Sequence, residues 1–370
     1  MMKKTKILID CHSFDYQYYQ GVTTYLSGIY NETVKNNPDI EFYFASKNIN
    51  KLKSVFGLSQ NIFYLKYTFK SPIMRLIFEL PFLILKNNID YLHVQYKSPL
   101  LKFCKEIVTV HDVLFLDFPQ YFGKTFRIIN KFYYRFSSKR ADILLTVSDY
   151  SAKRISKHFK ININSIFITP NGIDNTFLNF SNNKNLIPDI KSIYGIDKYI
   201  LYVSRIEPRK NHELVVKAYN ELNLADENIK LVFVGFETSI NKILNDQIKI
   251  TDRDNIIKLT NISVDNLAGL YACSLFTVFP SFVEGFGIPP IESTVMGTPV
   301  ILSNQTAMSD FYFIKDQMFD PNSIEEFKFK VKQALTGVFK DQTAKTEFVK
   351  KKYLWSSIGK KYSHIINNSK

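Results

Sequence analysis

Two glutamates enclose a glycine pair in the segment Pro280–Glu292, which reads Pro-Ser-Phe-Val-Glu-Gly-Phe-Gly-Ile-Pro-Pro-Ile-Glu. Gly285 and Gly287 allow a tight turn and a close approach of the backbone to a ligand. The two prolines that follow favour the start of a helix, and free N–H groups at a helix start bind phosphate. Glu284 and Glu292 accept hydrogen bonds from hydroxyl groups and repel phosphate, so they suit a sugar or a ribose. The segment predicts a site for a phosphorylated sugar; the alternative is a turn and helix cap without a ligand.

A second charged group lies in the segment Ser204–Asn211, directly after an apolar run that is typical of a strand. The loop after the first strand of a doubly wound sheet faces the ligand crevice. Arg205 offers forked donors and Lys210 a point charge, so the pair suits a diphosphate. The alternative is a solvated loop in which Glu207 and Arg209 form a surface ion pair.

Short apolar runs alternate with longer amphipathic stretches through both halves of the chain. Such runs are typical of strands buried on both faces, and their alternation with helices indicates parallel β–α–β units. Two successive series predict an α/β fold with two Rossmann-like domains in tandem. The expected strands are Lys6–Asp10, Ile40–Ala45, Ile62–Leu65, Ile89–Val94, Glu106–His111, Ile143–Val147, Ile166–Thr169, Tyr199–Ser204, Lys230–Gly235, Ile256–Leu259, Leu275–Phe279 and Pro299–Ser303.

The expected domain boundary lies in Asn175–Gly195, which is rich in Asn, Ser, Lys and Pro and lacks helical periodicity. We therefore expect one domain over residues 1–175 and a second over residues 176–354. The stretch Lys345–Asn367, which holds the single tryptophan Trp355, is predicted to be helical.

Together the motifs resemble those of the family 4 retaining glycosyltransferases. The match rests on Glu284-x7-Glu292, with Gly-Phe-Gly inside it, and on the Arg205-x4-Lys210 loop. Further matching segments, in the family's order, are Val110-His111-Asp112, Pro170-Asn171-Gly172-Ile173-Asp174, Gly297-Thr298-Pro299-Val300-Ile301 and Ser303-Asn304. The resemblance covers most of the chain and is specific for the fold and the donor class.

The resemblance implies a GT-B fold, in which two Rossmann-like domains face each other across a cleft. It implies that the N-terminal domain, residues 1–175, binds the acceptor. The C-terminal domain, residues 176–354, would bind the nucleotide sugar. The last helix, at about residues 355–370, would return to the first domain.

The resemblance also implies a role for individual residues. Arg205 and Lys210 would hold the donor diphosphate and stabilise its charge as the glycosidic bond breaks. Glu284 would accept hydrogen bonds from the transferred sugar, and Glu292 from the ribose diol. His111 would contact the transferring sugar at a strand end; the alternative is a histidine that only supports the fold. The catalytic residues implied are His111, Arg205, Lys210 and Glu284.

Further donor contacts are implied for the backbone of Gly285, Phe286, Gly287 and Ile288. Gly21, in the segment Tyr19–Tyr25, matches one glycine of a loop that closes on the phosphate, where many relatives have two. The segment Gln305–Asp310 departs from the family pattern of glycines and a Pro-Glu-Val run, which bears on donor choice. Asp112 is expected to cap and orient its loop.

The net charge of +14 lies mostly in the first half of the chain. Residues 1–180 carry 24 Lys/Arg against 13 Asp/Glu, a net +11. Such an excess indicates an anionic partner, with a compositional bias as the alternative. Five cations recur at helical spacing among aromatic residues, which is typical of a helix on anionic lipid or of a solvated basic face. They are Lys124, Arg127, Lys131, Arg135 and Lys139. No nucleic-acid motif accompanies this charge, so nucleic acid is not expected as a partner.

Other signals argue against rival classes of protein. The Asp-x-Asp triplet at Asp252–Asp254 lies in a polar turn before an expected strand, so it is interpreted as a solvated loop and no metal is expected. Cys11, Cys104 and Cys273 match neither a zinc site nor a disulfide framework, which favours a reducing cytoplasm. The apolar start is too short for a signal peptide, and the longest apolar run, Leu76–Leu85, is too short for a membrane span.

The sequence thus predicts a retaining glycosyltransferase that moves a hexose from a nucleotide diphosphate sugar to a hydroxyl of a growing glycan. The resemblance is to bacterial enzymes of O-antigen or capsule synthesis, so a lipid-linked acceptor and the inner face of the plasma membrane are expected. GDP-mannose is the first donor expected, followed by UDP-hexoses, with no cofactor. The alternatives are a nucleotide-sugar epimerase of the same fold and a non-catalytic nucleotide- or glycan-binding scaffold.

Overall fold

The structure of the protein, a computed structural model, describes residues 4–16, 21–237, 244, 248 and 253–369. The chain divides into two compact units. Unit 1 comprises Met1–Gly172 and Trp355–Lys370, and unit 2 comprises Ile173–Leu354. The chain passes from unit 1 to unit 2 between residues 172 and 173. The boundary predicted from the sequence lies between residues 175 and 176.

Unit 1 holds, within its described residues, a seven-stranded parallel sheet in the order β3-β2-β1-β4-β5-β6-β7. The strand order reverses between β1 and β4, and ligands of doubly wound folds bind at the carboxyl ends of the strands beside such a switch point. The strands are β1 (Thr5–Asp10), β2 (Ile40–Ser46), β3 (Ile62–Lys66), β4 (Tyr91–Gln95), β5 (Lys105–Thr109), β6 (Ile143–Thr146) and β7 (Ile166–Ile168).

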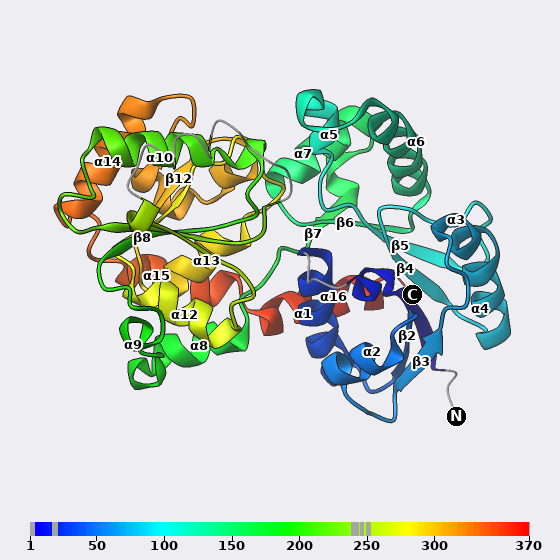
Figure 1. Ribbon diagram of the computed structural model, residues 1–370. Coiled ribbons are helices and arrows are strands. Elements are labelled where there is room, and N and C mark those ends of the chain that lie inside the picture. Colours follow the sequence, from blue (N-terminus) through cyan, green and yellow to red (C-terminus); the bar gives the residue numbers. More distant parts are fainter. Residues whose placement is uncertain (1–3, 17–20, 238–243, 245–247, 249–252, 370) are drawn as a thin grey trace. The chain divides into compact units, whose positions relative to one another are not determined.

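Helices cover both faces of this sheet (Figure 1). They are α1 (Gly21–Asn36), α2 (Ile49–Phe56), α3 (Pro72–Met74), the π-helical turn η2 (Arg75–Glu79), α4 (Leu80–Asn87), α5 (Leu114–Asp117), α6 (Lys124–Arg140), α7 (Asp149–Phe159) and α16 (Trp355–Asn367). Buried side chains of α4, α6 and α7 join those of the central strands in one apolar cluster.

Small residues fix α16 against α1. A Cβ at Gly28 would lie 2.0 Å from the ring of Trp355, and one at Gly359 would lie 2.6 Å from the side chain of Glu32. The two helices can therefore approach closely only because these positions carry no side chain. The last helix is thus part of unit 1.

Unit 2 holds a six-stranded parallel sheet, counted over its described residues, in the order β10-β9-β8-β11-β12-β13. Its switch point lies between β8 and β11. The strands are β8 (Tyr199–Val203), β9 (Lys230–Val234), β10 (Ile256–Leu259), β11 (Phe276–Phe279), β12 (Val300–Ser303) and β13 (Met318–Phe319). The helices are α8 (Asn175–Asn182), α9 (Ile190–Tyr194), α10 (His212–Glu221), α12 (Val264–Cys273), α13 (Ile288–Val295), α14 (Ile324–Leu335) and α15 (Thr343–Lys352).

The α/β fold class predicted from the sequence is confirmed, and each run predicted as a strand forms one. Residues 175–195, which lack helical periodicity in the sequence, nevertheless form two short helices. Asp174 and Asp189 each accept a hydrogen bond from a backbone N–H in the next turn and so start α8 and α9. Both helices are too short to show a period. No helix in the described part of the chain combines the length and apolarity needed to cross a bilayer.

Candidate functional site

The two charged segments predicted from the sequence meet at the switch point of unit 2. Segment Ser204–Asn211 follows β8, and segment Pro280–Gly287 follows β11, its neighbour in the sheet. A backbone hydrogen bond joins the loops, in which Phe282 N donates to Arg209 O over 2.9 Å. The parallel topology therefore brings residues far apart in sequence to one edge of the sheet, where doubly wound folds bind ligands.

A cluster of charged side chains occupies this edge. The Lys210 ammonium donates to one carboxylate oxygen of Glu284. The Arg209 guanidinium lies 3.6 Å from the other oxygen and donates to Val283 O over 3.0 Å. These three side chains are only 11% to 15% exposed. The structure thus brings Lys210 and Glu284 together and adds Arg209, which the sequence analysis named only in the alternative of a surface ion pair.

Burial and pairing set the charge states of this cluster. Burial lowers the pKa of Lys210, and Glu284 opposes that effect. Burial raises the pKa of Glu284, but the neighbouring Lys210 and Arg209 outweigh it, so the pKa falls below its usual value. Glu284 is therefore a carboxylate at neutral pH, able to accept from hydroxyl groups beside two cations.

The backbone of Glu284 is held by the segment that departs from the family pattern. Glu284 N donates to Thr306 Oγ1 over 3.0 Å, and Ala307 N donates to Glu284 O over 3.3 Å. Thr306 has φ of 54°, a strained conformation for a β-branched residue. Such strain clusters at functional sites. The sequence carries no signal for this contact.

Gly287 ends the turn and directly precedes α13. Its φ is 113°, and a Cβ there would lie 2.7 Å from Met308. The positive φ favours glycine at this position, whereas the Met308 methyl, at the end of a flexible side chain, could move aside. The predicted helix start is confirmed, but Pro289 and Pro290 have no N–H, so Ile288 and Ile291 supply the remaining donors of the first turn. A phosphate at this helix start would thus depend on nearby cations more than the sequence suggested.

Glu292 lies one turn into α13 and accepts a hydrogen bond from Tyr271 OH over 3.0 Å. Burial raises the pKa of Glu292 to about 7, with a smaller contribution from Asp174 and an opposing one from the Tyr271 bond. Neither Lys210 nor Arg209 is among the groups that shift its pKa. The two glutamates therefore have different surroundings, with only Glu284 beside cations.

The raised pKa of Glu292 predicts a component of stability that depends on pH. Between about pH 4.5 and about pH 7 this carboxyl is ionised in the unfolded chain and protonated in the folded one. The free energy of unfolding should therefore fall as pH rises through this window and level off above it. Glu292→Gln, which keeps an acceptor for Tyr271, should remove this component. Denaturant unfolding of both proteins from pH 4 to pH 8 checks this; parallel curves would contradict the assigned pKa.

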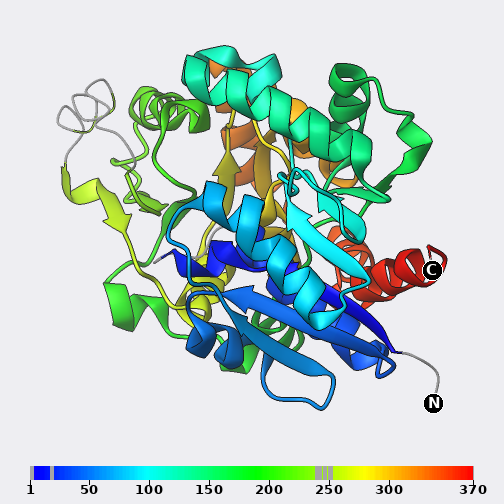
Figure 2. The ribbon, with the colours of Figure 1, turned by 90° about the vertical axis from the view of Figure 1, so that its right-hand side faces the viewer.

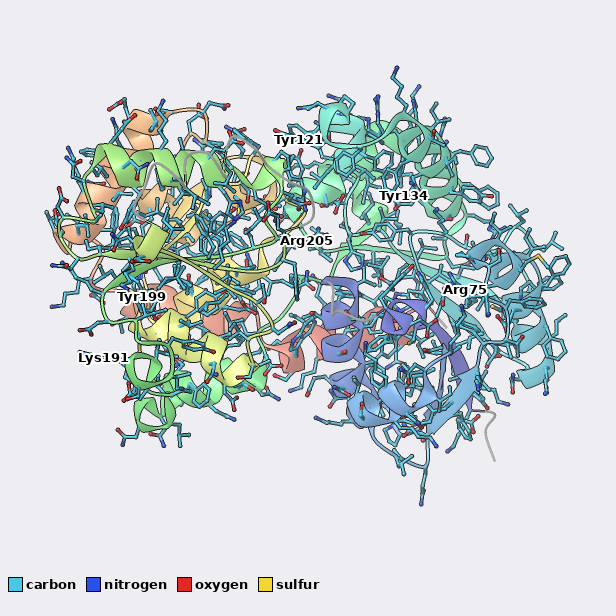
Figure 3. The ribbon with its side chains drawn as sticks, in the orientation of Figure 1. Arg75, Tyr121, Tyr134, Lys191, Tyr199 and Arg205 are labelled. Carbon is cyan, nitrogen blue, oxygen red and sulfur yellow. The ribbon has the colours of Figure 1, made fainter. Side chains whose placement is uncertain are left out.

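Arg205 takes a different position from its predicted partner. Its side chain is 57% exposed at the end of β8 and lies 3.5 Å from Glu207 (Figure 3). Glu207 also lies 2.5 Å from Arg209, so the ion pair considered as an alternative does form, but with side chains only 15% and 17% exposed. Contact of Arg205 with a diphosphate remains a prediction.

The predicted acceptor-domain residue His111 lies after β5 in unit 1, one strand beyond the β1–β4 pair that forms the switch point. It is buried, its Nε2 lies 2.7 Å from Gln95 Oε1, and the Tyr25 ring packs edge-on against it. Burial lowers the pKa of His111 to about 3. The imidazole is therefore neutral and its Nε2–H donates to Gln95, which suits contact with a sugar better than with a phosphate.

The remaining predicted residues are placed as follows. Gly21 begins α1, and a Cβ there would meet nothing within 4 Å, so unit 1 has no steric need for glycine. Asp112 accepts from Leu114 N over 3.2 Å at the start of α5. Tyr19 and Asp252 lie outside the described residues. Over the ranges the structure describes, no three His, Cys, Asp or Glu side chains gather to hold a metal ion.

Comparison with known proteins gives matches to both units. A family model described as Glycosyltransferase Family 4 matches residues 19–177, and one described as Glycosyl transferases group 1 matches residues 183–353. O-antigen chain mannosyltransferase B of Escherichia coli is 28% identical over 234 residues, 62% of this chain and 61% of its own length. O-antigen chain mannosyltransferase RfbU of Salmonella typhimurium is 29% identical over 204 residues, 54% of this chain and 52% of its own. The chain thus spans less than two thirds of the length of the curated relatives it matches.

Solved structures extend the likeness over the whole fold. A glycosyltransferase from Rickettsia africae is similar with a TM-score of 0.75 at 18% identity, covering 99% of this chain and 98% of its own. HepE of Anabaena, in complex with UDP and glucose, has a TM-score of 0.73 at 12% identity, covering 98% and 99%. These similarities confirm the predicted GT-B fold type.

Proposed function

Because the chain belongs to the family 4, or group 1, glycosyltransferases, we propose that it transfers a hexose from a nucleotide diphosphate sugar to a hydroxyl of a glycan. Relatives named O-antigen mannosyltransferases favour mannose, and hence GDP-mannose, as the first donor to test. HepE, which was solved with UDP and glucose, keeps UDP-hexoses as the next candidates.

The observation that carries this proposal is the Lys210–Glu284–Arg209 cluster at the switch point of unit 2. A nucleotide sugar presents a dianionic diphosphate beside neutral hydroxyl groups. Lys210 and Arg209 suit the diphosphate, and the carboxylate of Glu284 suits the hydroxyl groups but repels phosphate. The side chain of Arg205 is exposed on the same loop and can extend toward the donor. Glu292, away from these cations, suits the ribose diol.

We propose that transfer proceeds with retention of the anomeric configuration. The bond from the anomeric carbon to the phosphate oxygen breaks, and the acceptor hydroxyl forms a new bond on the same face. The acceptor's proton passes to the departing phosphate oxygen, so no protein base is needed. Lys210 would stabilise the negative charge that grows on the diphosphate, which is usually the largest catalytic contribution.

The acceptor is proposed to be a glycan, lipid-linked during its growth, that reaches neutral His111 at the carboxyl end of β5 in unit 1. His111 and Gln95 offer polar atoms suited to sugar hydroxyl groups. We propose peripheral attachment to the inner face of the plasma membrane, with the cations of α6 against anionic lipid. This places the enzyme where a lipid-linked acceptor is found.

A donor screen tests the proposal. One GDP- or UDP-hexose should raise the melting temperature, because a ligand that binds only the folded state stabilises it. Since cations of the protein take the part of a metal ion, both this shift and the turnover should survive EDTA. Loss of turnover on chelation, restored by manganese or magnesium, would contradict the proposed mechanism. Asp252→Asn serves as the matched variant and should behave as wild type.

A further inference from the structure

The helical segment from Pro72 to Asn87, made of α3, η2 and α4, buries its charges together with apolar side chains such as Leu80, Leu83 and Ile84. Its two ionisable residues before Lys86, Arg75 and Glu79, are buried, with 9% and 5% exposed. Its outer face is apolar instead, with side chains between 37% and 62% exposed. The exposed residues are Ile73, Met74, Ile77, Phe78, Phe82 and Leu85.

The buried charges of Arg75 and Glu79 have partners inside unit 1, which stabilise their burial. Arg75 lies 3.5 Å from Asp10 and packs over the ring of Tyr67 (Figure 3). Glu79 accepts from Thr68 Oγ1 over 2.8 Å. The π-helical turn at these residues shifts the register of the helix, a feature often found at functional sites. A row of large apolar side chains is thus exposed to water. A monomer in solution rarely exposes such a row.

Helix α6 also exposes large apolar side chains. Its buried residues are Asn130, Tyr134, Ser137 and Ser138, most of which carry small polar side chains. Phe126, Ile128, Ile129 and Phe132 are instead 46% to 72% exposed, among the basic residues. The alternative of an ordinary helix that buries its apolar side and solvates only its charges therefore does not describe α6.

Helix α6 and the helical segment from Pro72 to Asn87 lie on one side of unit 1. Both are at the right in Figure 1, and Figure 2 turns that side toward the viewer. The loop after β4 packs against α6: Lys97 lies over the ring of Tyr133, and Arg140 donates to Leu100 O over 2.6 Å. This loop adds exposed Leu100, Leu101 and Phe103. We call the outer surfaces of residues 69–86, 100–103 and 124–139 the docking face.

We propose that the docking face seats unit 1 on an anionic lipid bilayer, with the apolar row of residues 73–85 entering the headgroup boundary. The choice of occupant follows from charge. Residues 97–105 and 122–140 contain no acid, and the one acid of residues 66–86 is the buried Glu79. Exposed Lys70, Lys86, Lys124, Lys131 and Lys139 lie on the same segments as the apolar side chains, so a second copy would meet like charges, whereas anionic lipid meets opposite ones.

This inference deepens the proposed membrane location and does not depend on the transfer reaction. Co-sedimentation of the full chain with vesicles of phosphatidylcholine and phosphatidylglycerol tests it. The triple variant Ile77→Gln, Phe78→Gln, Phe82→Gln should lower the partition coefficient roughly a hundredfold, including at high salt. Replacing Lys124, Arg127, Lys131 and Arg135 by Gln should abolish only the electrostatic part of vesicle binding, which salt screens.

A matched control removes equally exposed apolar side chains elsewhere, through Phe329→Gln and Val338→Gln in unit 2, and should bind as wild type. The melting temperature and the nucleotide-induced shift should be unchanged in all variants, since the replaced side chains are exposed. Equal vesicle binding by the triple variant and wild type would overturn the proposal. So would a wild type that ignores vesicles but self-associates in sedimentation velocity through the same three residues.

Discussion

Glu284→Gln should reduce turnover at least tenfold while leaving the affinity for the nucleoside diphosphate nearly unchanged. Glu284 is proposed to face the sugar that is transferred, so its loss acts mainly in the transition state. The amide still accepts from Lys210, so the loop geometry survives the change. Calorimetry with the diphosphate and steady-state kinetics with the donor measure the two effects separately.

Glu292→Gln is the matched variant, because it makes the same chemical change eight positions along the motif. If Glu292 binds the ribose, donor and diphosphate should weaken together and the Michaelis constant should rise more than turnover falls. Reversed behaviour of the two variants would mean that the orientation of the motif is wrong. If both variants behave as wild type, the motif is only a turn and does not bind the donor.

Lys210→Ala should lower kcat/KM by about 30- to 1000-fold, the result of losing roughly 2–4 kcal/mol of charge stabilisation in the transition state. Arg205→Ala should show an effect of the same order, although its side chain is exposed in the structure, because the diphosphate would draw it in. Lys191→Ala, which removes an exposed cation of unit 2 paired with Asp197, is the matched control and should be silent.

Removing Lys210 also leaves Glu284 without its nearest cation, which destabilises a part-buried carboxylate. The double variant Lys210→Ala, Glu284→Gln removes that charge and should regain the stability but not the activity. Turnover within a factor of two of wild type for both Lys210→Ala and Arg205→Ala would rule out their assigned role.

The sequence predicted most of the fold because buried parallel strands and amphipathic helices leave distinct periods. Strand β13 was missed since Met318–Phe319 is too short to form a pattern. The site was predicted where one motif carries its own geometry, as in Glu284, Gly287 and Glu292. Arg209 was not among the predicted site residues, because sequence shows which residues share a loop but not which of them turns inward.

The same limit explains why the sequence does not show which faces of α6 and α4 are buried. Periodicity indicates which residues lie on one face of a helix, and apolar faces are assumed to be the buried ones. Here the packing of unit 1 buries Asn130 and Arg75 and leaves Phe132 and Phe82 outside. Thr306 had no signal at all, because its contact with Glu284 N joins segments that only the sheet brings together.

Sugar transfer itself is the most direct test of the account. Radiolabelled GDP-mannose and UDP-hexoses would be incubated with the full chain and a panel of octyl glycosides in the presence of EDTA. We expect labelled, elongated octyl glycoside from at least one donor with wild type, and at least tenfold less with Glu284→Gln. Label that stays on the nucleotide for every donor, or a nucleotide sugar that changes into another without any acceptor, would contradict it.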